Sequence, residues 1–221
     1  MIKITGIGWI TQKKYGCIIR KYNRPYANIK SLYSQLREES VLTDNIKNFA
    51  RFNDVSKITC CAAGLALYDA GMLSPARSKD DVGLIGTSTD GCLQSNLHYF
   101  QDYIENGRTL ARGGLFSYTL PSSPMADAAI NFGLKGPLIY MAFQQKQVPL
   151  LLQQAKTMIQ EKEASVMLAI KADQERAICF ICEKNRGLLL ENAFKLQEII
   201  HVTDNFSSLR EIISVLEKGC L

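Results

Sequence analysis

Residues 133–145, GLKGPLIYMAFQQ, link the end of one helix to a buried strand and to the turn before a second helix. Gly133 ends an alanine-rich helix predicted over 123–132, and the apolar run 138–143 predicts a strand. A helix follows over 147–161, with Pro149 in its first turn, where a missing N–H is tolerated. The stretch predicts a helix–strand–helix unit in which Gln145 lies in the connection between the strand and the second helix.

The rest of the chain continues this alternation. Strands are predicted over 2–8, 82–87, 165–171, 176–183 and 197–202. Helices are predicted over 57–71, with Ser56 and Gly71 as caps, over 92–106 and over 206–218. Residues 12–55 are less regular, and 108–121 form a loop. Near-continuous apolar strands among helices predict an α/β layered fold with a mixed buried sheet, as one domain over 1–221.

Composition limits the classes of function. The chain has 221 residues, 47% of them hydrophobic, a net charge of +5 and a pI of about 8.8. This basic excess is too weak to indicate nucleic acid, and no apolar run approaches the roughly 20 residues of a membrane helix. Seven cysteines without a secretory signal indicate a cytoplasmic protein with reduced thiols.

One cysteine pair invites a metal or redox interpretation. Cys179 and Cys182 form a CxxC within an apolar run that predicts a strand. Residues three apart on a strand point to opposite faces, so the two thiols do not converge on a metal. We interpret them as core cysteines and expect neither a metal nor a cofactor.

Five short segments carry a family resemblance. They are Ile4-Thr5-Gly6-Ile7-Gly8, Ala62-Ala63 through Asp69-Ala70-Gly71, Val82-Gly83-Leu84-Ile85-Gly86-Thr87-Ser88, Leu120-Pro121 through Gly136-Pro137, and Glu163-Ala164-Ser165-Val166-Met167-Leu168-Ala169. In this order they resemble the N-terminal half of the β-ketoacyl synthases, the condensing enzymes of fatty-acid and polyketide assembly. The resemblance covers residues 1–185 and leaves the tail 186–221 unassigned. It implies a single half of a layered thiolase-like α/β fold.

Two departures from the family bear on activity. Gln145 falls by spacing where the family carries its acyl-accepting cysteine, and a carboxamide cannot form a thioester. The family's two catalytic histidines lie in its C-terminal half. The histidines of this chain, His98 and His201, lie in no family histidine motif, and a surface or helix-end position is expected for both. The resemblance therefore implies a subunit without condensing activity of its own.

Chain-length factors, the non-condensing partners of polyketide synthases, often carry glutamine at the cysteine position. The chain resembles a truncated chain-length factor of the kind expected in aryl polyene or related type II polyketide systems. This implies pairing with a catalytic ketosynthase, whose acyl tunnel the chain shapes during elongation from acyl carrier protein thioesters. Two alternatives stay open: a free-standing acyltransferase or malonyl decarboxylase that uses Gln145, and a non-enzymatic protein that binds an acyl chain or its carrier.

The resemblance also implies where a partner binds. In the family, the strand before the nucleophile lies at the dimer axis; here its residues are Leu138, Ile139, Tyr140, Met141, Ala142 and Phe143. As a solvated edge, so apolar a strand is an aggregation hazard, which favours pairing over exposure. The alternative is a central strand covered within the monomer. The loop before residue 123 reaches toward the mate's acyl pocket in relatives, so Leu115, Phe116 and Tyr118 are candidates for a tunnel gate, with core packing as the alternative.

Two further groups have open roles. Gln145 is expected to be structural, either an inert filler that satisfies buried backbone groups or a hydrogen-bonding group at the interface. The basic residues are Lys13, Lys14, Arg20, Lys21 and Arg24. A solvated surface is the leading interpretation for them, and docking of an acidic acyl carrier protein is the alternative.

Overall fold

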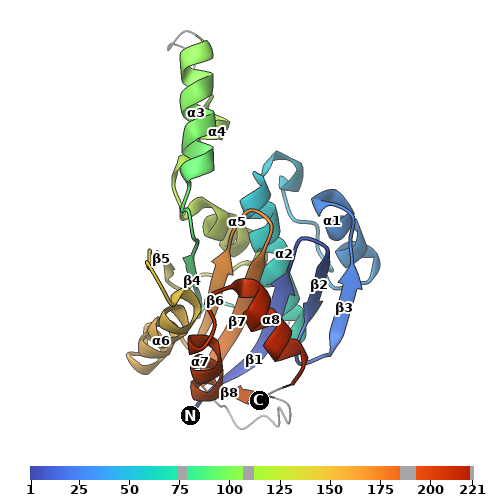
Figure 1. Ribbon diagram of the computed structural model, residues 1–221, viewed down its shortest axis with the longest axis vertical. Coiled ribbons are helices and arrows are strands. Elements are labelled where there is room, and N and C mark those ends of the chain that lie inside the picture. Colours follow the sequence, from blue (N-terminus) through green and yellow to red (C-terminus); the bar gives the residue numbers. More distant parts are fainter. Residues whose placement is uncertain (74–78, 107–111, 185–192, 220–221) are drawn as a thin grey trace.

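The computed structural model describes residues 1–73, 79–106, 112–184 and 193–219 (Figure 1). Within these residues one mixed sheet has the strand order β3-β2-β1-β7-β6-β4-β5, with β8 also paired to β1. Strand β4 is parallel to β5 and β6, and the other pairs are antiparallel. The strands are β1 (Ile2–Ile10), β2 (Lys14–Cys17), β3 (Tyr22–Pro25), β4 (Val82–Thr87), β5 (Leu138–Tyr140), β6 (Val166–Ala172), β7 (Ala177–Lys184) and β8 (Phe194–Lys195).

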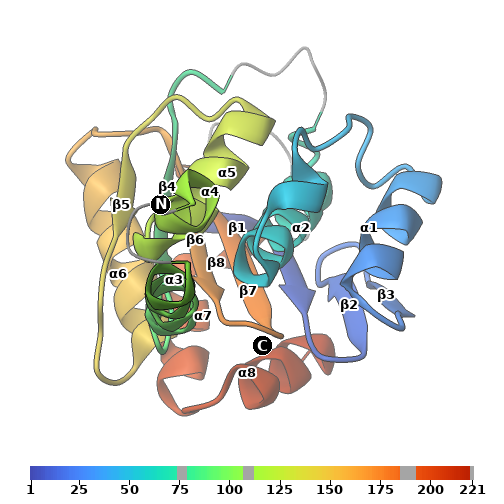
Figure 2. The same cartoon turned by 90° about the horizontal axis from the view of Figure 1, so that it is seen from above.

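Helices cover both faces of this sheet (Figure 2). Helices α1, α2 and α5 pack on one face, and α6, α7 and α8 pack on the other. The helices are α1 (Ile29–Glu38), α2 (Asp54–Asp69), α3 (Leu93–Glu105), α4 (Gly113–Phe116), α5 (Ser123–Phe132), α6 (Gln147–Gln160), α7 (Leu196–Asp204) and α8 (Leu209–Glu217), with short 3-10 turns at Phe49–Arg51 and Ser117–Thr119.

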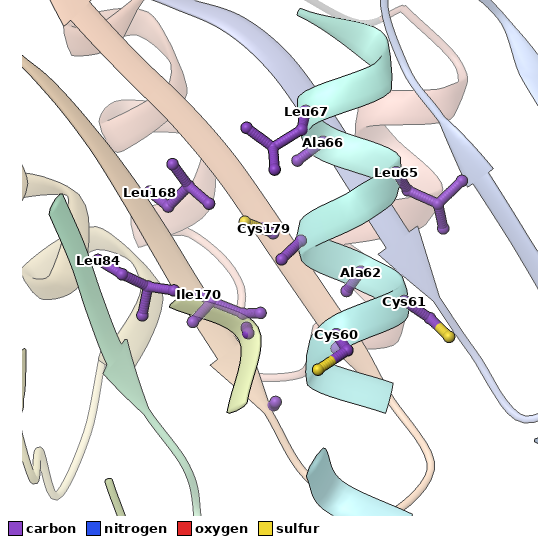
Figure 3. Close-up of a cluster of buried hydrophobic side chains, with 14 of the residues drawn as sticks. Cys60, Cys61, Ala62, Leu65, Ala66, Leu67, Leu84, Leu168, Ile170 and Cys179 are labelled. Atoms are coloured by element: carbon purple, nitrogen blue, oxygen red, sulfur yellow. The ribbon is translucent and has the colours of Figure 1, made fainter. Parts of the chain in front are cut away.

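Strand β6 shows why the central strands are mainly apolar. Leu168 and Ile170 point into the core beneath α2, whereas Met167 and Ala169 point into the core beneath α6. Figure 3 shows the first of these two cores, where Leu168 and Ile170 lie beside α2. Because both faces are buried, the strand has no polar side, which confirms the predicted buried mixed sheet.

Helix α2 lies directly against strand β1. A Cβ atom built at Gly8 would lie 2.4 Å from the backbone nitrogen of Ala66 and 2.6 Å from the carbonyl oxygen of Ala62. At Gly6 it would lie 2.4 Å from the carbonyl oxygen of Ala66. The two backbones approach so closely that a side chain on this side of β1 has no room.

A buried carboxylate fastens the end of α2. Oδ2 of Asp69 accepts hydrogen bonds from the backbone N–H groups of Ile7 (2.8 Å) and Ile19 (3.1 Å), and Oδ1 accepts one from Arg20 (2.9 Å). Burial raises the pKa of Asp69, and the three N–H donors oppose that rise. One side chain therefore joins α2 to β1 and to the segment after β2.

Two sequence predictions were wrong. Residues 12–55, expected to be less regular, contain β2, β3 and α1. The expected strand over 197–202 lies within helix α7, whose buried residues Leu196, Ile199, Ile200 and Thr203 follow helical spacing. The adjacent isoleucines suggested a strand, but only one face of this segment meets the core.

The observed ends of several other helices and strands differ from the predicted ones. Asn53, not Ser56, caps α2, while Gly71 takes the predicted left-handed conformation at φ +65°. The strand expected over 138–143 ends at Tyr140, and the described part of the loop 108–121 contains α4. A capping box of Ser208 and Glu211 starts α8 three residues later than expected. Strand β1 extends two residues beyond its predicted end.

Replacing Gly8 with alanine should destabilise the fold. The new methyl group meets backbone atoms of Ala62 and Ala66 in α2, which cannot rotate away, so we expect Gly8→Ala to lower the free energy of unfolding by about 3 kcal/mol or more. Urea denaturation followed by circular dichroism measures this. The matched control is Gly114→Ala in α4, where nothing lies within 4 Å of the added Cβ. Equal stability of the two variants would contradict the close contact.

Candidate functional site

The turn between β5 and α6 is held by a residue in the left-handed region. The backbone N–H of Met141 donates to the carbonyl oxygen of Gly86 at 2.9 Å, and the chain then leaves the sheet. Lys146 has φ 49° and ψ 40° and directly precedes α6. A non-glycine residue with positive φ is uncommon and marks a constrained turn. Gln145, which falls by spacing at the family's cysteine position, directly precedes Lys146.

At this turn Gln147, rather than Gln145, bonds to buried backbone groups. The side chain of Gln145 is exposed and makes no hydrogen bond with the described residues. Gln147 instead donates through Nε2 to the carbonyl oxygens of Phe143 (2.9 Å) and Ser88 (3.4 Å). The expectation that Gln145 satisfies buried backbone groups is therefore wrong. That task falls to Gln147, whose Oε1 is buried without a hydrogen-bond partner.

A hollow of about 460 Å³ opens at this turn. One wall is the start of α6, and the opposite wall is the connection from α7 to α8. Residues Thr89 and Lys171 come from the ends of the neighbouring strands. The lining residues are Thr89, Gln144, Gln145, Lys146, Gln147, Val148, Pro149, Lys171, Asp204, Asn205, Phe206, Ser207, Leu209 and Ile212.

Two lysines of unlike environment line this hollow. Lys146 is largely exposed, and its Nζ lies 2.9 Å from Oδ1 of Asp204. Such exposed ion pairs contribute only about 0–1 kcal/mol. Lys171 is 8% exposed, and burial lowers its pKa, an effect that the charge of Asp173 partly offsets. Both oxygens of Asp173 accept from Thr89, at 2.8 Å from its backbone N–H and 3.2 Å from its hydroxyl.

Strand β5 forms one edge of the sheet, so the residues expected at an interface are not sealed inside the molecule. Leu138 and Ala142 are exposed, and the four others, Ile139, Tyr140, Met141 and Phe143, are half-buried. The hydroxyl of Tyr140 lies 3.0 Å from the Ser88 hydroxyl. The backbone groups of Pro137 and Met141 bond to β4. By strand alternation, those of Leu138 and Tyr140 point to the open edge.

The three residues expected to gate a tunnel do not share one surface. Phe116 is 56% exposed and packs edge-on against Tyr99 of α3, with ring centroids 5.6 Å apart. Tyr118 packs against the core beneath α2, and burial raises its pKa to about 12. Leu115 is half-buried. Phe116 alone of the three is presented outward.

Helix α3 and α4 form an arm that projects from the body (Figure 1). At its base, Sγ of Cys92 donates to the carbonyl oxygen of Thr119 at 2.8 Å, and near the outer end of α3 Arg112 pairs with the buried Asp102. The large apolar residues on one face of α3 are between 48% and 60% exposed: Leu93, Leu97, Phe100 and Ile104. The sequence predicted this face but not its exposure, because periodicity does not tell what covers a helix.

The remaining candidates lie apart from the hollow. Cys179 and Cys182 point into opposite cores, as predicted. His98 and His201 are exposed on α3 and α7. The Arg20 Nε donates to the Tyr68 carbonyl oxygen at 3.0 Å, and Arg24 pairs with Glu39 at 3.5 Å. Lys13 and Lys14 lie at one end of the β2–β3 hairpin and Lys21 at the other, so the five basic residues form no single cluster.

Comparison with known proteins finds matches in fold, but none among family models or curated protein sequences. No family model matches the chain, and no curated protein matches it in sequence. Solved structures do match. The ishigamide ketosynthase/chain length factor shares 14% identity at a TM-score of 0.62, with 85% of this chain and 63% of that chain covered. A ketosynthase in complex with its chain length factor from Xenorhabdus doucetiae shares 13% identity at a TM-score of 0.57, with 84% and 80% covered.

A third match is a type II acyl-carrier protein in complex with its ketosynthase bound to the hexaketide, at 12% identity and a TM-score of 0.58. It covers 87% of this chain and 65% of that chain. The chain therefore has the thiolase-like α/β fold of the ketosynthases and chain length factors, as the sequence predicted. It spans about three fifths of the length of the first of these structures. Among the described helices, none is long and apolar enough to cross a membrane.

The two glutamines of the turn should differ in their contribution to stability. Gln147→Met removes the donor to two carbonyl groups, so we expect it to lower the free energy of unfolding by about 1 kcal/mol. Gln145→Met should change it by less than about 0.5 kcal/mol because the side chain is exposed. Urea denaturation of both variants measures the difference. A larger loss for Gln145→Met would overturn this assignment.

Proposed function

We propose that this chain is a non-catalytic subunit that pairs with a separate catalytic ketosynthase and shapes its acyl tunnel, in the manner of a chain-length factor. The tunnel acts during chain elongation from acyl carrier protein thioesters, in an aryl polyene or related type II polyketide system. The observation that carries this proposal is the open, apolar edge at β5, next to a turn that holds glutamine in place of a nucleophile.

The edge at β5 supports pairing with another chain. The outward backbone groups of Leu138 and Tyr140 have no strand beside them within the described residues, and the Leu138 side chain is exposed. The segment carries no charge and, after Pro137, no proline, the two features that keep solvated edges from pairing. A partner strand satisfies these groups and buries the apolar side chains.

The projecting arm of α3 and α4 supports a second contact with a partner chain. An isolated helix of 13 residues is marginal in water, and an apolar stripe such as that of α3 normally faces a core. The projecting α3 exposes this stripe over three turns (Figure 1), and Phe116 and Leu120, which follow it in the chain, are exposed as well. Burial of one such side chain yields about 1.5–3 kcal/mol, so a partner seated on the arm gains substantial stabilisation.

The residues around the hollow support a subunit without condensing chemistry. Gln145 and Lys146 occupy the turn where a nucleophile would sit, and the hollow has neither a cysteine nor a histidine in its lining. Of the described cysteines, five are buried, and Cys92 lies at the start of α3. Burial raises the thiol pKa of Cys60, Cys61 and Cys179, which disfavours the reactive thiolate.

Condensation assays with malonyl-carrier substrate test the pairing. We expect no product from this chain alone, and product from its mixture with a ketosynthase that retains its cysteine and histidines and is encoded next to it. Leu138→Lys places a charge on the open edge and should weaken the complex by about tenfold or more. Size-exclusion chromatography and the yield of condensed product report this loss.

The matched control for this edge is Ser34→Lys, which adds the same charge to an exposed position of α1, at the other end of the sheet. We expect it to bind as the parent does. Turnover by the chain alone would instead establish a free-standing acyltransferase or decarboxylase. Binding of the ketosynthase by Leu138→Lys at full strength would remove β5 from the interface.

Phe116 tests whether the chain shapes the tunnel. Phe116→Ala removes a large exposed side chain, and a shorter group leaves room for more methylene units, so we expect the reconstituted pair to make longer products. Mass spectrometry of the released chains measures the distribution. His98→Ala, on the exposed surface of α3, is the control and should leave product length unchanged. An unchanged distribution with Phe116→Ala would argue against a gate.

A further inference from the structure

A second hollow, of about 580 Å³, lies at the opposite end of α6 from Gln147, and we call it the β8 hollow. It is lined by the last turns of α6, the start of β1, the end of β7 and the residues that join β8 to α7. The N-terminus, β8 and α7 lie at one end of the molecule (Figure 1). Lys195, Leu196 and Gln197 of the lining belong to the tail 186–221, which the ketosynthase resemblance leaves unassigned. That resemblance therefore gives the β8 hollow no role.

Three lysines from three elements line the β8 hollow: Lys156 of α6, Lys184 of β7 and Lys195 of β8. Lys184 follows Cys182 by two residues, and Cys182 points into the core beneath α6. By strand alternation, Lys184 lies on this same face of the sheet. Strand β1 pairs with both β7 and β8, so the ends of these two strands meet at the start of β1. The fold thus gathers three ammonium groups that are distant in sequence.

The positive charge of the β8 hollow is only partly offset. Among the described residues that line it, none carries a carboxylate. Lys195 Nζ lies 2.7 Å from Oε1 of Glu198, outside the lining, and this pair offsets one charge. Lys156 Nζ lies 3.4 Å from the neutral Oε1 of Gln197. Lys184 forms neither a hydrogen bond nor an ion pair with the part of the chain that the structure describes. Two like charges that face one concave space favour the binding of an anion.

Two ammonium groups match a doubly charged ligand. A carboxylate carries one negative charge, whereas a phosphate monoester carries about 1.5 to 2 at pH 7 and has three acceptor oxygens. Lysine binds phosphate as a point charge, and its flexible stem lets ammonium groups from two elements reach one phosphate. A phosphate monoester therefore suits Lys156 and Lys184 better than a carboxylate does.

The rest of the lining indicates what the phosphate is attached to. Ile159 of α6 and Leu196 of α7 are 4% and 2% exposed, and Ile2 is half-buried. These apolar side chains form a wall beside the lysines. A volume of about 580 Å³ lies within the range of small-molecule sites and exceeds what a phosphate ion needs. The hollow therefore suits a phosphate on an organic body that is partly apolar.

We propose that the β8 hollow binds a small phosphate monoester with a partly apolar body, whose phosphate lies between the ammonium groups of Lys156 and Lys184. The apolar part contacts Ile159 and Leu196. This binding goes beyond the role of the chain as a ketosynthase partner and does not depend on it. Every group involved belongs to this chain, and none lies on β5 or on the arm of α3 and α4.

Isothermal titration calorimetry on the full chain without a ketosynthase tests the proposal. Phenyl phosphate serves as the probe, benzoate as its singly charged analogue, and inorganic phosphate as the doubly charged anion without an apolar body. We expect saturable binding of phenyl phosphate, and binding of both analogues weaker by about tenfold or more. Lys156→Met and Lys184→Met remove one charge each and keep most of the side-chain length, and each should weaken phenyl phosphate by about tenfold.

Lys30→Met, at an exposed position of α1, is the matched control and should bind phenyl phosphate as the parent does. Thermal unfolding of each variant establishes that it is folded, and Lys184 is exposed, so its replacement should leave the fold intact. Undiminished binding by folded Lys156→Met and Lys184→Met would overturn the site, and so would an equal loss with Lys30→Met. Benzoate or inorganic phosphate bound as tightly as phenyl phosphate would overturn the proposed ligand class.

Discussion

The contact between α2 and β1 is the constraint on which the rest of the structure depends. Gly6 and Gly8 carry no side chains between β1 and α2, and Ala62 and Ala66 in α2 carry only methyl groups. The helix therefore rests on the strand backbone, and Asp69 holds its end through three backbone donors. Since β1 is paired with β2, β7 and β8, this one contact sets where the helical layer lies over the whole sheet.

The sequence predicted the parts of the fold that are governed by local rules. The apolar strands β4, β6 and β7 were found because both faces are buried, and α5 because Gly133 ends it at φ +65°. Strands β2 and β3 were missed because four residues of mixed polarity carry no clear period. Helix α7 was mistaken for a strand because Ile199 and Ile200 are adjacent, and only the helical spacing of its buried residues explains them.

The candidate site, too, was predicted from the sequence only in part. Spacing led to the turn after β5, but it did not show that Gln147, rather than Gln145, bonds to the backbone there. Which glutamine points inward depends on where the chain bends at Lys146. Lys171 went unnoticed because one lysine at the end of an apolar strand is ordinary in sequence. Its place in the hollow depends on the fold, because residues from Asp204 to Leu209 line the same space. The exposure of the apolar face of α3 was likewise not predictable, because it depends on which other elements pack against the helix.

The two edges of the sheet differ in chemistry. Strand β3 ends one side with Asn23, Arg24 and Pro25, and such polar residues and prolines discourage a further strand. Strand β5 ends the other side with Leu138, Ile139 and Tyr140 and has no such protection. This asymmetry is a property of the sequence: the residues of β3 discourage a further strand, and those of β5 do not.

The central position of β1 has a consequence for how the chain is made. Ile2 pairs with Lys184 and Ile10 with Ala177, so β1 meets its neighbour β7 only after about 170 further residues have been synthesised. Until then β1 has only β2 as a nearby partner, and the edge that β7 covers stays open. Contacts this distant in sequence form slowly. Nascent chains of this protein should therefore depend on chaperones until β7 emerges.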